Sequence, residues 1–246
     1  MVNVNNEYSK LKEVIVGTIN NANMPAHGTD LHAINYADKD KIPYKERFYF
    51  HDDVYRETEE DLEHLVTTLK EFGVKVHRPK TIKTDSLVSN GHWSTDQYYT
   101  FCPRDTMTVI GDTIIEAPMT LRSRQFETDA YRDLFIEYMG NGSKWICAPK
   151  PRLTDDSYQR KDLSKLTLTE VEPVFDAANI LRHNDDILYL NSNTGNYKGY
   201  VWLRNLLGDK YKIHFLENMY SYSHIDSTIA ILRDGLVLLN PARVND

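Results

Sequence analysis

The sequence has few cysteines, no long apolar run and no excess of positive charge, and each absence excludes a class of protein. Its two cysteines, Cys102 and Cys147, form neither a CxxC metal-binding pair nor a disulfide framework. No apolar run approaches the ~20 residues that a membrane-spanning helix needs. The formal net charge of −7 argues against a nucleic-acid partner and against an anionic membrane surface. We therefore expect no nucleic-acid partner and no membrane partner.

The N-terminus also lacks a targeting signal. Residues 1–17 contain neither the apolar core of a secretory signal nor an Arg-rich amphipathic segment. The scarcity of cysteine is typical of a reducing compartment, so we expect a cytoplasmic protein. With 246 residues, of which 41% are hydrophobic, the chain can form a sizeable core, and we expect a single domain over residues 1–246.

Turn signals and apolar periodicity predict strands and helices that alternate along the chain. Residues 11–17 are predicted to form a strand, and the polar residues 20–52 a long loop. Apolar residues at helical spacing predict three helices that each end at a glycine, over 54–73, 126–140 and 199–208. Three hairpins are predicted to turn at Gly111-Asp112, near Asn184-Asp185 and at Asp234-Gly235.

These elements form a faint repeat, in which hairpin and helix recur about every 50 to 70 residues. Each hairpin follows an aspartate: Asp105, Asp176 or Asp226. If the units are modules around a common axis, the three aspartates are in register and their carboxylates converge. The alternative is that each aspartate is an ordinary turn or cap residue.

His224 stands two residues before Asp226, at the start of an apolar run. We expect both side chains on one face of a strand, since residues i and i+2 share a face. An imidazole next to several carboxylates suggests an acid/base group; the alternative is a structural, hydrogen-bonded histidine.

Several aspartates in one enclosed site imply a cationic ligand. Guanidinium fits because it is planar, always charged and binds carboxylates in bidentate fashion. A divalent metal is the rival, but the sequence has no DxDxDG-type loop, so we expect no metal and no cofactor. Arg243, just after the third hairpin, could meet the carboxylate of an amino-acid ligand, or could be a surface arginine.

Long blocks of the sequence resemble the glycine amidinotransferases, the arginine-dependent enzymes that make guanidinoacetate. The resemblance runs from about residue 6 to the end of the chain and is carried by NEYSKLKEVIVG, PRDTMTVIGDTIIEAPMTLRSRQFETDAYR, KWICAPKP, EPVFDAANILR, GYVWLRNLL and HIDSTIAILRDGLVLLNPAR. It implies an α/β fold, a pseudo-symmetric propeller of five ββαβ modules, of which about four are expected here. It also implies small-molecule substrates, L-arginine and an amine acceptor, and leaves a homodimer open.

The family mechanism implies roles for particular residues. A cysteine thiolate attacks the guanidinium carbon, ornithine leaves, and the amine takes the amidino group. The resemblance makes Asp176 and His224 the catalytic acid/base pair. It makes Asp105 and Asp226 the ligands of the guanidinium, and Arg243 the ligand of the substrate carboxylate.

The sequence departs from the family pattern in three places. The family's catalytic cysteine lies in a later Gly-rich GGGxHCxT-like segment, so we expect the C-terminal module to be missing here. Neither Cys102 nor Cys147 matches that motif, and we expect both to be small buried thiols. Residues 221–223 are Ser-Tyr-Ser where the glycine-specific enzymes have an Asn-Pro-Met-like segment, which resembles bacterial enzymes with other acceptors. Asn179 replaces a second aspartate of the family's FDAAD.

Three functions stay open at this point. The first is amidino transfer from arginine to glycine or another amine. The second is hydrolysis of a guanidino group, as in arginine deiminases or dimethylarginine hydrolases, where water is the acceptor. The third is a truncated, inactive protein that binds arginine without turnover.

Overall fold

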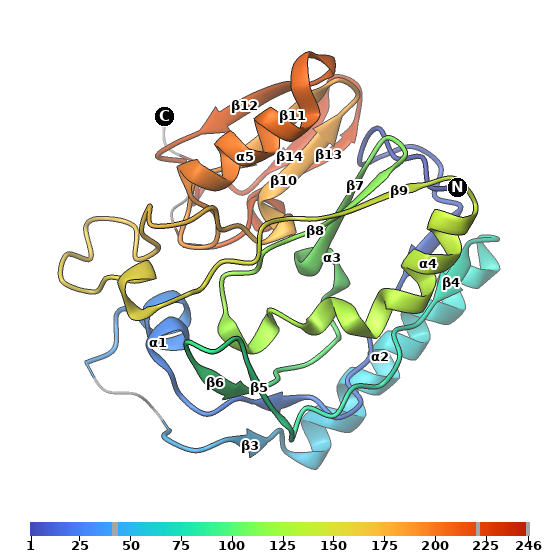
Figure 1. The fold of residues 1–246 in the computed structure, drawn as a ribbon. Helices are drawn as coiled ribbons and strands as arrows, with labels where there is room; N and C mark the ends of the chain where they lie inside the picture. Colours follow the sequence, from blue (N-terminus) through green and yellow to red (C-terminus); the bar gives the residue numbers. More distant parts are fainter. Residues whose placement is uncertain (41–43, 220–221, 245–246) are drawn as a thin grey trace.

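The computed structural model describes residues 1–40, 44–219 and 222–244, which form small sheets with helices between them (Figure 1). The α/β class expected from the sequence is confirmed. The N-terminal part consists of short strand pairs and two helices of unequal length. Its elements are β1 (Glu13–Ile15), β2 (Asn23–Met24), α1 (Thr29–Asn35), β3 (Phe48–Tyr49), α2 (Asp52–Glu71), β4 (Lys75–His77), β5 (Leu87–Ser89) and β6 (Ser94–Asp96).

Helix α2 lies along one edge of the molecule and leads into β4, which pairs in parallel with β1 (Figure 1). It begins after His51, whose Nδ1 accepts a hydrogen bond from the Asp53 N–H at 3.4 Å. It ends before Gly73, whose φ of +75° suits a glycine just past a helix C-terminus. Val66 is its one fully buried side chain, so most of this helix faces solvent.

Two ββαβ units follow and share one topology. The first contains β7 (Met107–Ile110), β8 (Thr113–Glu116), α4 (Arg132–Gly140) and β9 (Lys144–Cys147). The second contains β10 (Ile180–His183), β11 (Asp186–Leu190), α5 (Tyr197–Leu207) and β12 (Lys212–Leu216). In each unit an antiparallel hairpin is joined by a third, parallel strand, because the helix carries the chain back across the sheet.

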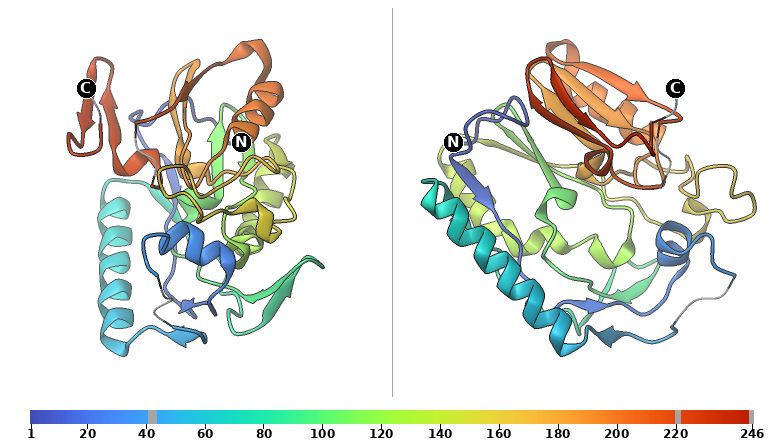
Figure 2. Two further views of the ribbon diagram at one scale, coloured as in Figure 1. Left: turned by 90° about the vertical axis from the view of Figure 1, so that its left-hand side faces the viewer. Right: turned by 180° about the vertical axis from the view of Figure 1, so that it is seen from behind.

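A third hairpin, β13 (Ile229–Arg233) and β14 (Leu236–Leu239), ends the described chain. In the left view of Figure 2 this red hairpin extends to one side of the other sheets. Its inner end packs through Ile229 and Ile231 against Leu181 and Leu190 of the second unit. Its outer strand β14 is exposed along its whole length.

The main core lies between the two ββαβ units, and α5 of the second unit packs against it. Phe175, Tyr189, Ile187 and Leu203 are fully buried there, and burying each such side chain contributes about 1.5–3 kcal/mol. Helix α5 approaches the sheet closely at Gly199, where an added Cβ would lie 2.5 Å from the Tyr189 hydroxyl oxygen. Only glycine permits that approach, and the core fixes the loops at the strand ends.

The predicted hairpins and helices are confirmed, and several boundaries and elements differ. The helix expected over 126–140 begins at Arg132, because residues 127–131 form a 3-10 turn. The loop expected over 20–52 contains α1 and two short strands. Strands β9 and β12 were not predicted as members of the repeat, since both are half-exposed and end without a strong turn signal.

Candidate functional site

The site is built on short helical turns that precede the hairpins. These are α3 (Pro103–Thr106) and two 3-10 turns, η4 (Ala177–Asn179) and η6 (Ile225–Ser227). Turn η4 contacts both α3 and η6, so chain segments far apart in sequence meet where the hairpins begin. Their side chains reach a pocket of about 410 Å³. It is lined by residues of α1, α3 and the loops around them: Ile34, Asn35, Tyr36, Tyr98, Tyr99, Asp105, Leu121, Arg124, Asp176, Thr194, Tyr222, Ser223 and His224.

The expectation that His224 and Asp226 share a strand face is wrong. His224 precedes η6, and the strand begins only at Ile229. Because the chain turns helically between them, the two side chains diverge. His224 points to Asp105 and Asp176, whereas Asp226 lies near the Arg104 guanidinium, with Nε and Oδ2 3.8 Å apart.

The expected register of the three aspartates is also only approximate. Asp105, Asp176 and Asp226 stand two, four and three residues before their strands. Each residue of offset in a helical turn rotates the side chain by about 100°. Asp105 and Asp176 therefore meet at His224, while Asp226 stays half-exposed and is not among the described residues that line the pocket.

The imidazole of His224 lies between two carboxylates. Its Nε2 is 3.1 Å from Asp176 Oδ2, and its Nδ1 is 3.6 Å from Asp105 Oδ1. Burial alone would lower the pKa of His224, but the hydrogen bond to Asp176 and the charges of Asp105, Asp176 and Asp226 together raise it. These groups therefore stabilise the imidazolium form relative to a free imidazole.

Asp176 is held in place by Thr120. Its Oδ1 accepts hydrogen bonds from the Thr120 backbone N–H, at 2.9 Å, and from the Thr120 hydroxyl. Burial would raise the pKa of Asp176, but the hydrogen bond and charge of His224, the charge of Arg124 and the Thr120 hydroxyl lower it overall. The carboxylate thus stays ionised and fixes the orientation of the His224 ring.

A buried arginine, which the sequence did not single out, neutralises the other carboxylate. Arg124 is 3% exposed, and its Nη1 donates to Asp105 Oδ2 at 2.7 Å. The same guanidinium binds both oxygens of Glu127, at 2.7 and 3.1 Å, and lies 4.8 Å from the centre of the Tyr99 ring. The sequence feature that could have indicated this pair is the RSRQFE segment, in which Arg124 precedes Glu127 by three residues.

Glu127 is the most perturbed carboxyl group beside the pocket. Burial, together with the negative charges of Asp105 and Asp176, outweighs the attraction of Arg124 and raises the pKa of Glu127 to about 7. For Arg124 burial acts in the opposite direction and would lower the pKa, but Glu127, Tyr99 and Asp105 raise the pKa of Arg124 well above its usual range. Arg124 therefore remains charged within a network of acids.

The other predicted site residues lie farther out. The Arg243 guanidinium donates to the Ser227 carbonyl oxygen at 3.1 Å, and Arg243 is not among the described residues that line the pocket. Asn179 is buried and donates to the Thr194 hydroxyl oxygen at 2.9 Å. Ser221 lies outside the described residues.

The two cysteines do not have the environment of a nucleophile. Cys102 is partly buried, and burial and the charge of Asp105 raise its pKa to about 12. Cys147 is exposed, which corrects the expectation of a buried thiol, because it ends the edge strand β9. Its sulfur is still partly shielded from water. This shielding and the Glu116 carboxylate, which the Sγ meets at 3.0 Å, raise the pKa of Cys147 to about 11. Both thiols therefore stay protonated near neutral pH.

Two further tests concern the described part of the chain. Within it, no group of three or more His, Cys, Asp and Glu side chains is placed to hold a metal ion. Nor does any helix there have the length and apolar character needed to cross a bilayer.

Known proteins are similar to this chain in sequence and fold, although no protein-family model matches the chain. The chain is 45% identical over 250 residues to inosamine-phosphate amidinotransferase 1 of Streptomyces glaucescens, covering all of this chain and 71% of that protein. It is 38% identical over 255 residues to the L-arginine:L-lysine amidinotransferase of Pseudomonas savastanoi pv. phaseolicola, covering 97% and 68%. The mitochondrial glycine amidinotransferase of Xenopus laevis is 36% identical, covering 97% and 60%.

The fold agrees with that of a solved relative. The structure of an inosamine-phosphate amidinotransferase from Streptomyces griseus superposes with a TM-score of 0.96 at 47% identity, covering all of this chain and 71% of that one. Sequence and fold therefore give the same answer, and the chain belongs to the amidinotransferases, a family of enzymes.

Proposed function

We propose that the protein transfers the amidino group of L-arginine to an amine acceptor and releases ornithine. The observation that carries this proposal is the His224 imidazole held between Asp105 and Asp176 in one pocket. Carboxylates suit a guanidinium ligand, and the imidazole can exchange protons with the two amines of the reaction.

Asp176 and His224 act as one unit in this proposal. Asp176 keeps the ring oriented through Nε2, since its other oxygen is occupied by Thr120. The raised pKa of His224 favours its protonated form, the form needed to protonate departing ornithine. His224 then accepts the proton that the incoming amine loses.

Asp105 is the proposed guanidinium ligand inside the pocket. Arg124 occupies one of its oxygens, while the other lies 3.6 Å from His224. A carboxylate oxygen has two lone pairs, so Asp105 Oδ1 can accept a substrate N–H as well. Asp226 and Arg243 lie outside the pocket lining, and we propose that they contact substrate only at its rim.

The chemistry divides into two half-reactions. A thiolate sulfur forms a bond to the guanidinium carbon, and the bond from that carbon to the ornithine nitrogen breaks, with the electron pair and a proton going to that nitrogen. The acceptor nitrogen then attacks the same carbon, the carbon–sulfur bond breaks, and the thiolate returns. The raised pKa values of Cys102 and Cys147 assign this thiolate to neither residue.

The acceptor is an amine other than glycine in our proposal. The relatives with 45% identity are named for inosamine phosphate, while the glycine enzyme is 36% identical. Tyrosines 36, 98, 99 and 222 line the pocket, and such rings suit a hydroxylated carbocycle, whose C–H groups pack on aromatic faces.

We further propose that the ββαβ units are modules of a pseudo-symmetric propeller. The support is the shared topology of the β7–β9 and β10–β12 sheets, each preceded by a short helical turn with an aspartate in it, as in α3, or directly before it, as in η4. The third hairpin begins in the same way.

The test is ornithine release from arginine, measured with a phosphorylated aminocyclitol, lysine, glycine or no acceptor. We expect release that depends on the amine and that disappears in His224→Gln. Lys39→Ala, which changes an exposed side chain, is the control. Citrulline formation without an amine would instead make the protein a hydrolase, and release that persists in His224→Gln would remove His224 from the reaction.

A further inference from the structure

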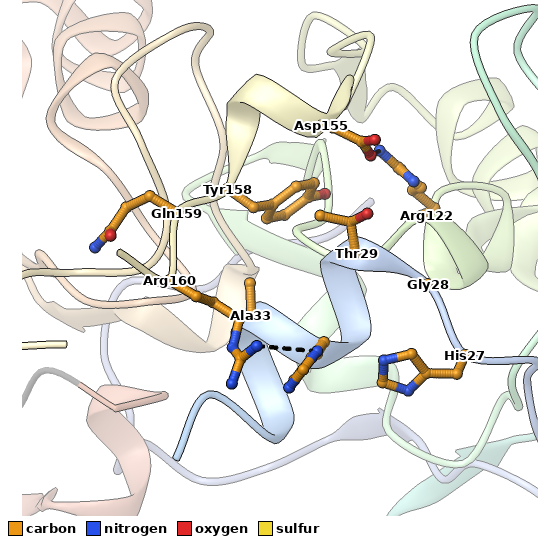
Figure 3. A pocket seen from close by; sticks show the side chains of 10 residues that line it. His27, Gly28, Thr29, Ala33, Arg122, Asp155, Tyr158, Gln159 and Arg160 are labelled. Carbon is orange, nitrogen blue, oxygen red and sulfur yellow. Dashed lines mark hydrogen bonds and ion pairs between the residues drawn. The ribbon is translucent and has the colours of Figure 1, made fainter. Parts of the chain in front are cut away.

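A second pocket, of about 540 Å³, lies between the start of α1 and residues 155–160 (Figure 3). Ala33 of α1 lines this pocket, whereas the next residues, Ile34 and Asn35, line the pocket of His224. Neighbouring residues of one short helix thus line both pockets. The mechanism above uses none of the second pocket's side chains.

Basic side chains dominate this second pocket, although the protein carries a net charge of −7. Two arginines and two histidines line it, against one acidic residue: Arg122, Arg160, His27, His32 and Asp155. Figure 3 shows Arg122 and Asp155 together at one side and Arg160 at the other. Asp155 already pairs with Arg122 at 2.7 Å, so the charge of Arg160 has no acidic counterpart among the described lining residues.

Arg160 is fixed with its positive charge at the pocket. Its Nη2 donates to the carbonyl oxygens of Ala37 and Lys39, at 2.9 and 2.5 Å, and its Nη1 lies 3.2 Å from His32 Nδ1. These hydrogen-bond partners are neutral, and the acid whose pKa the charge of Arg160 lowers is the exposed Asp38, which pairs with Lys39 at 2.9 Å. Its Nε is buried and has no hydrogen-bond partner among the described residues.

His27 adds two more unused polar atoms. Both of its ring nitrogens are buried without a hydrogen-bond partner in the described chain, although the ring packs edge-on against His32 and Tyr44. Burial and the nearby positive charges of His32 and Arg160 lower the pKa of His27. A buried donor without a partner is unfavourable, and the single N–H of a neutral His27 ring could donate to an anionic ligand.

Two other acids lie near this pocket, Asp30 and Asp38, and neither is among its described lining residues. Asp30 is buried behind Arg122 and accepts the Arg122 backbone N–H at 2.9 Å, and burial raises the pKa of Asp30 despite the charge of Arg122. Asp38 is exposed and pairs with Lys39 at 2.9 Å.

We propose that the pocket bounded by His27, His32 and Arg160 binds a phosphate group. A phosphate supplies several acceptor oxygens and a negative charge, which match Arg160 and the N–H of His27. His32 serves as a support for Arg160, because its Nδ1 accepts from Arg160 and its Nε2 donates to the Lys39 carbonyl oxygen at 2.9 Å. The source is either a phosphorylated acceptor, a version that rests on the function proposed above, or free phosphate. The floor of the pocket also touches the catalytic network, because the Tyr158 hydroxyl donates at 2.8 Å to the carbonyl of Thr120, which holds Asp176.

Titration with inorganic phosphate, followed by calorimetry, tests the site without arginine. We expect saturable binding that weakens about tenfold or more in Arg160→Gln, the loss expected for a charge-assisted hydrogen bond. Arg56→Gln is the matched control, since it removes the same charge from the exposed face of α2. No saturable binding, or equal weakening in both variants, would overturn the proposal.

A second variant guards against misfolding, because Arg160 also anchors the carbonyls of Ala37 and Lys39. His27→Phe keeps the ring packing and removes both nitrogens, so we expect phosphate binding to weaken while the thermal midpoint changes little. Unchanged phosphate affinity in His27→Phe would contradict a role for His27.

Steady-state kinetics separate the two sources. If the acceptor carries the phosphate, Arg160→Gln raises the KM for a phosphorylated aminocyclitol and leaves the KM for lysine unchanged. If free phosphate is the ligand, both KM values stay the same while calorimetry still shows the loss. Failure of amidino transfer itself would leave the calorimetric result intact, so the two proposals fail separately.

Discussion

Replacing Arg124 by methionine should destabilise the protein strongly. Arg124 is buried, and its guanidinium is the cation next to both Asp105 and Glu127. Methionine fills a similar volume but leaves the buried Glu127 without its counter-charge and Asp105 with only His224 beside it. Removing one partner of a buried ion pair costs about 3–5 kcal/mol, and the lost contact with the Tyr99 ring adds about 1 kcal/mol. We expect the free energy of unfolding to fall by about 4 kcal/mol or more at pH 8.

The loss should depend on pH with a defined sign. Without Arg124, the pKa of Glu127 rises further, so the folded variant binds more protons than the folded parent. Stability then falls more steeply with rising pH in the variant, and the deficit narrows as the pH drops from 8 towards 5. The Glu127 pKa of about 7 in the parent places this window near neutrality.

Chemical denaturation at several pH values measures the effect. Arg56→Met is the control, because Arg56 is exposed and such substitutions change stability by about 0.5 kcal/mol or less. Adding Glu127→Gln to Arg124→Met removes one uncompensated charge and should restore about 1–3 kcal/mol at pH 8. A loss below about 1 kcal/mol that does not change with pH would refute the reasoning.

Three further predictions concern the pocket and its support. Asp176→Asn should lower the pKa of His224, measured by NMR titration. It should also remove the stabilisation that protonated His224 gives the folded state, which is complete below about pH 6.5 and is lost as the pH rises through the pKa of His224 in the folded protein. An unchanged titration of His224 would contradict this. Asn196→Ala should cost about 2–4 kcal/mol, because the buried side chain of this α5 N-cap bonds four backbone groups; Asn141→Ala, on the surface, should cost far less. Arg243→Ala should raise the KM for arginine with little change in kcat, and an unchanged KM would make Arg243 a surface residue.

Local signals in the sequence were enough for the hairpins and for α2. The turns at Gly111 and Asn184 have φ values of +58°, a conformation that glycine and asparagine adopt readily. The apolar stripe of residues 54–73, together with Gly73 at its end, was enough to predict the helix. Such features depend on neighbours in the chain, so they can be read without knowledge of the packing.

The site could be predicted only in part, because its geometry depends on packing between distant segments. The sequence pointed to Asp105, Asp176 and His224, and the structure brings these three together. It could not place Asp226, since one residue of offset in a helical turn redirects the side chain. Arg124 was missed because a buried arginine looks like any other in sequence until its acidic partners are known.

Arginine binding tests the central claim most directly, because it requires the pocket but no nucleophile. Calorimetry would compare L-arginine with L-citrulline, a neutral compound of similar shape, for the parent protein and for Asp105→Asn. The account predicts that the parent prefers arginine by about tenfold or more, as a charged hydrogen bond implies, and that Asp105→Asn loses this preference. Equal affinity of the parent for the two compounds, or an unchanged preference in the variant, would contradict it.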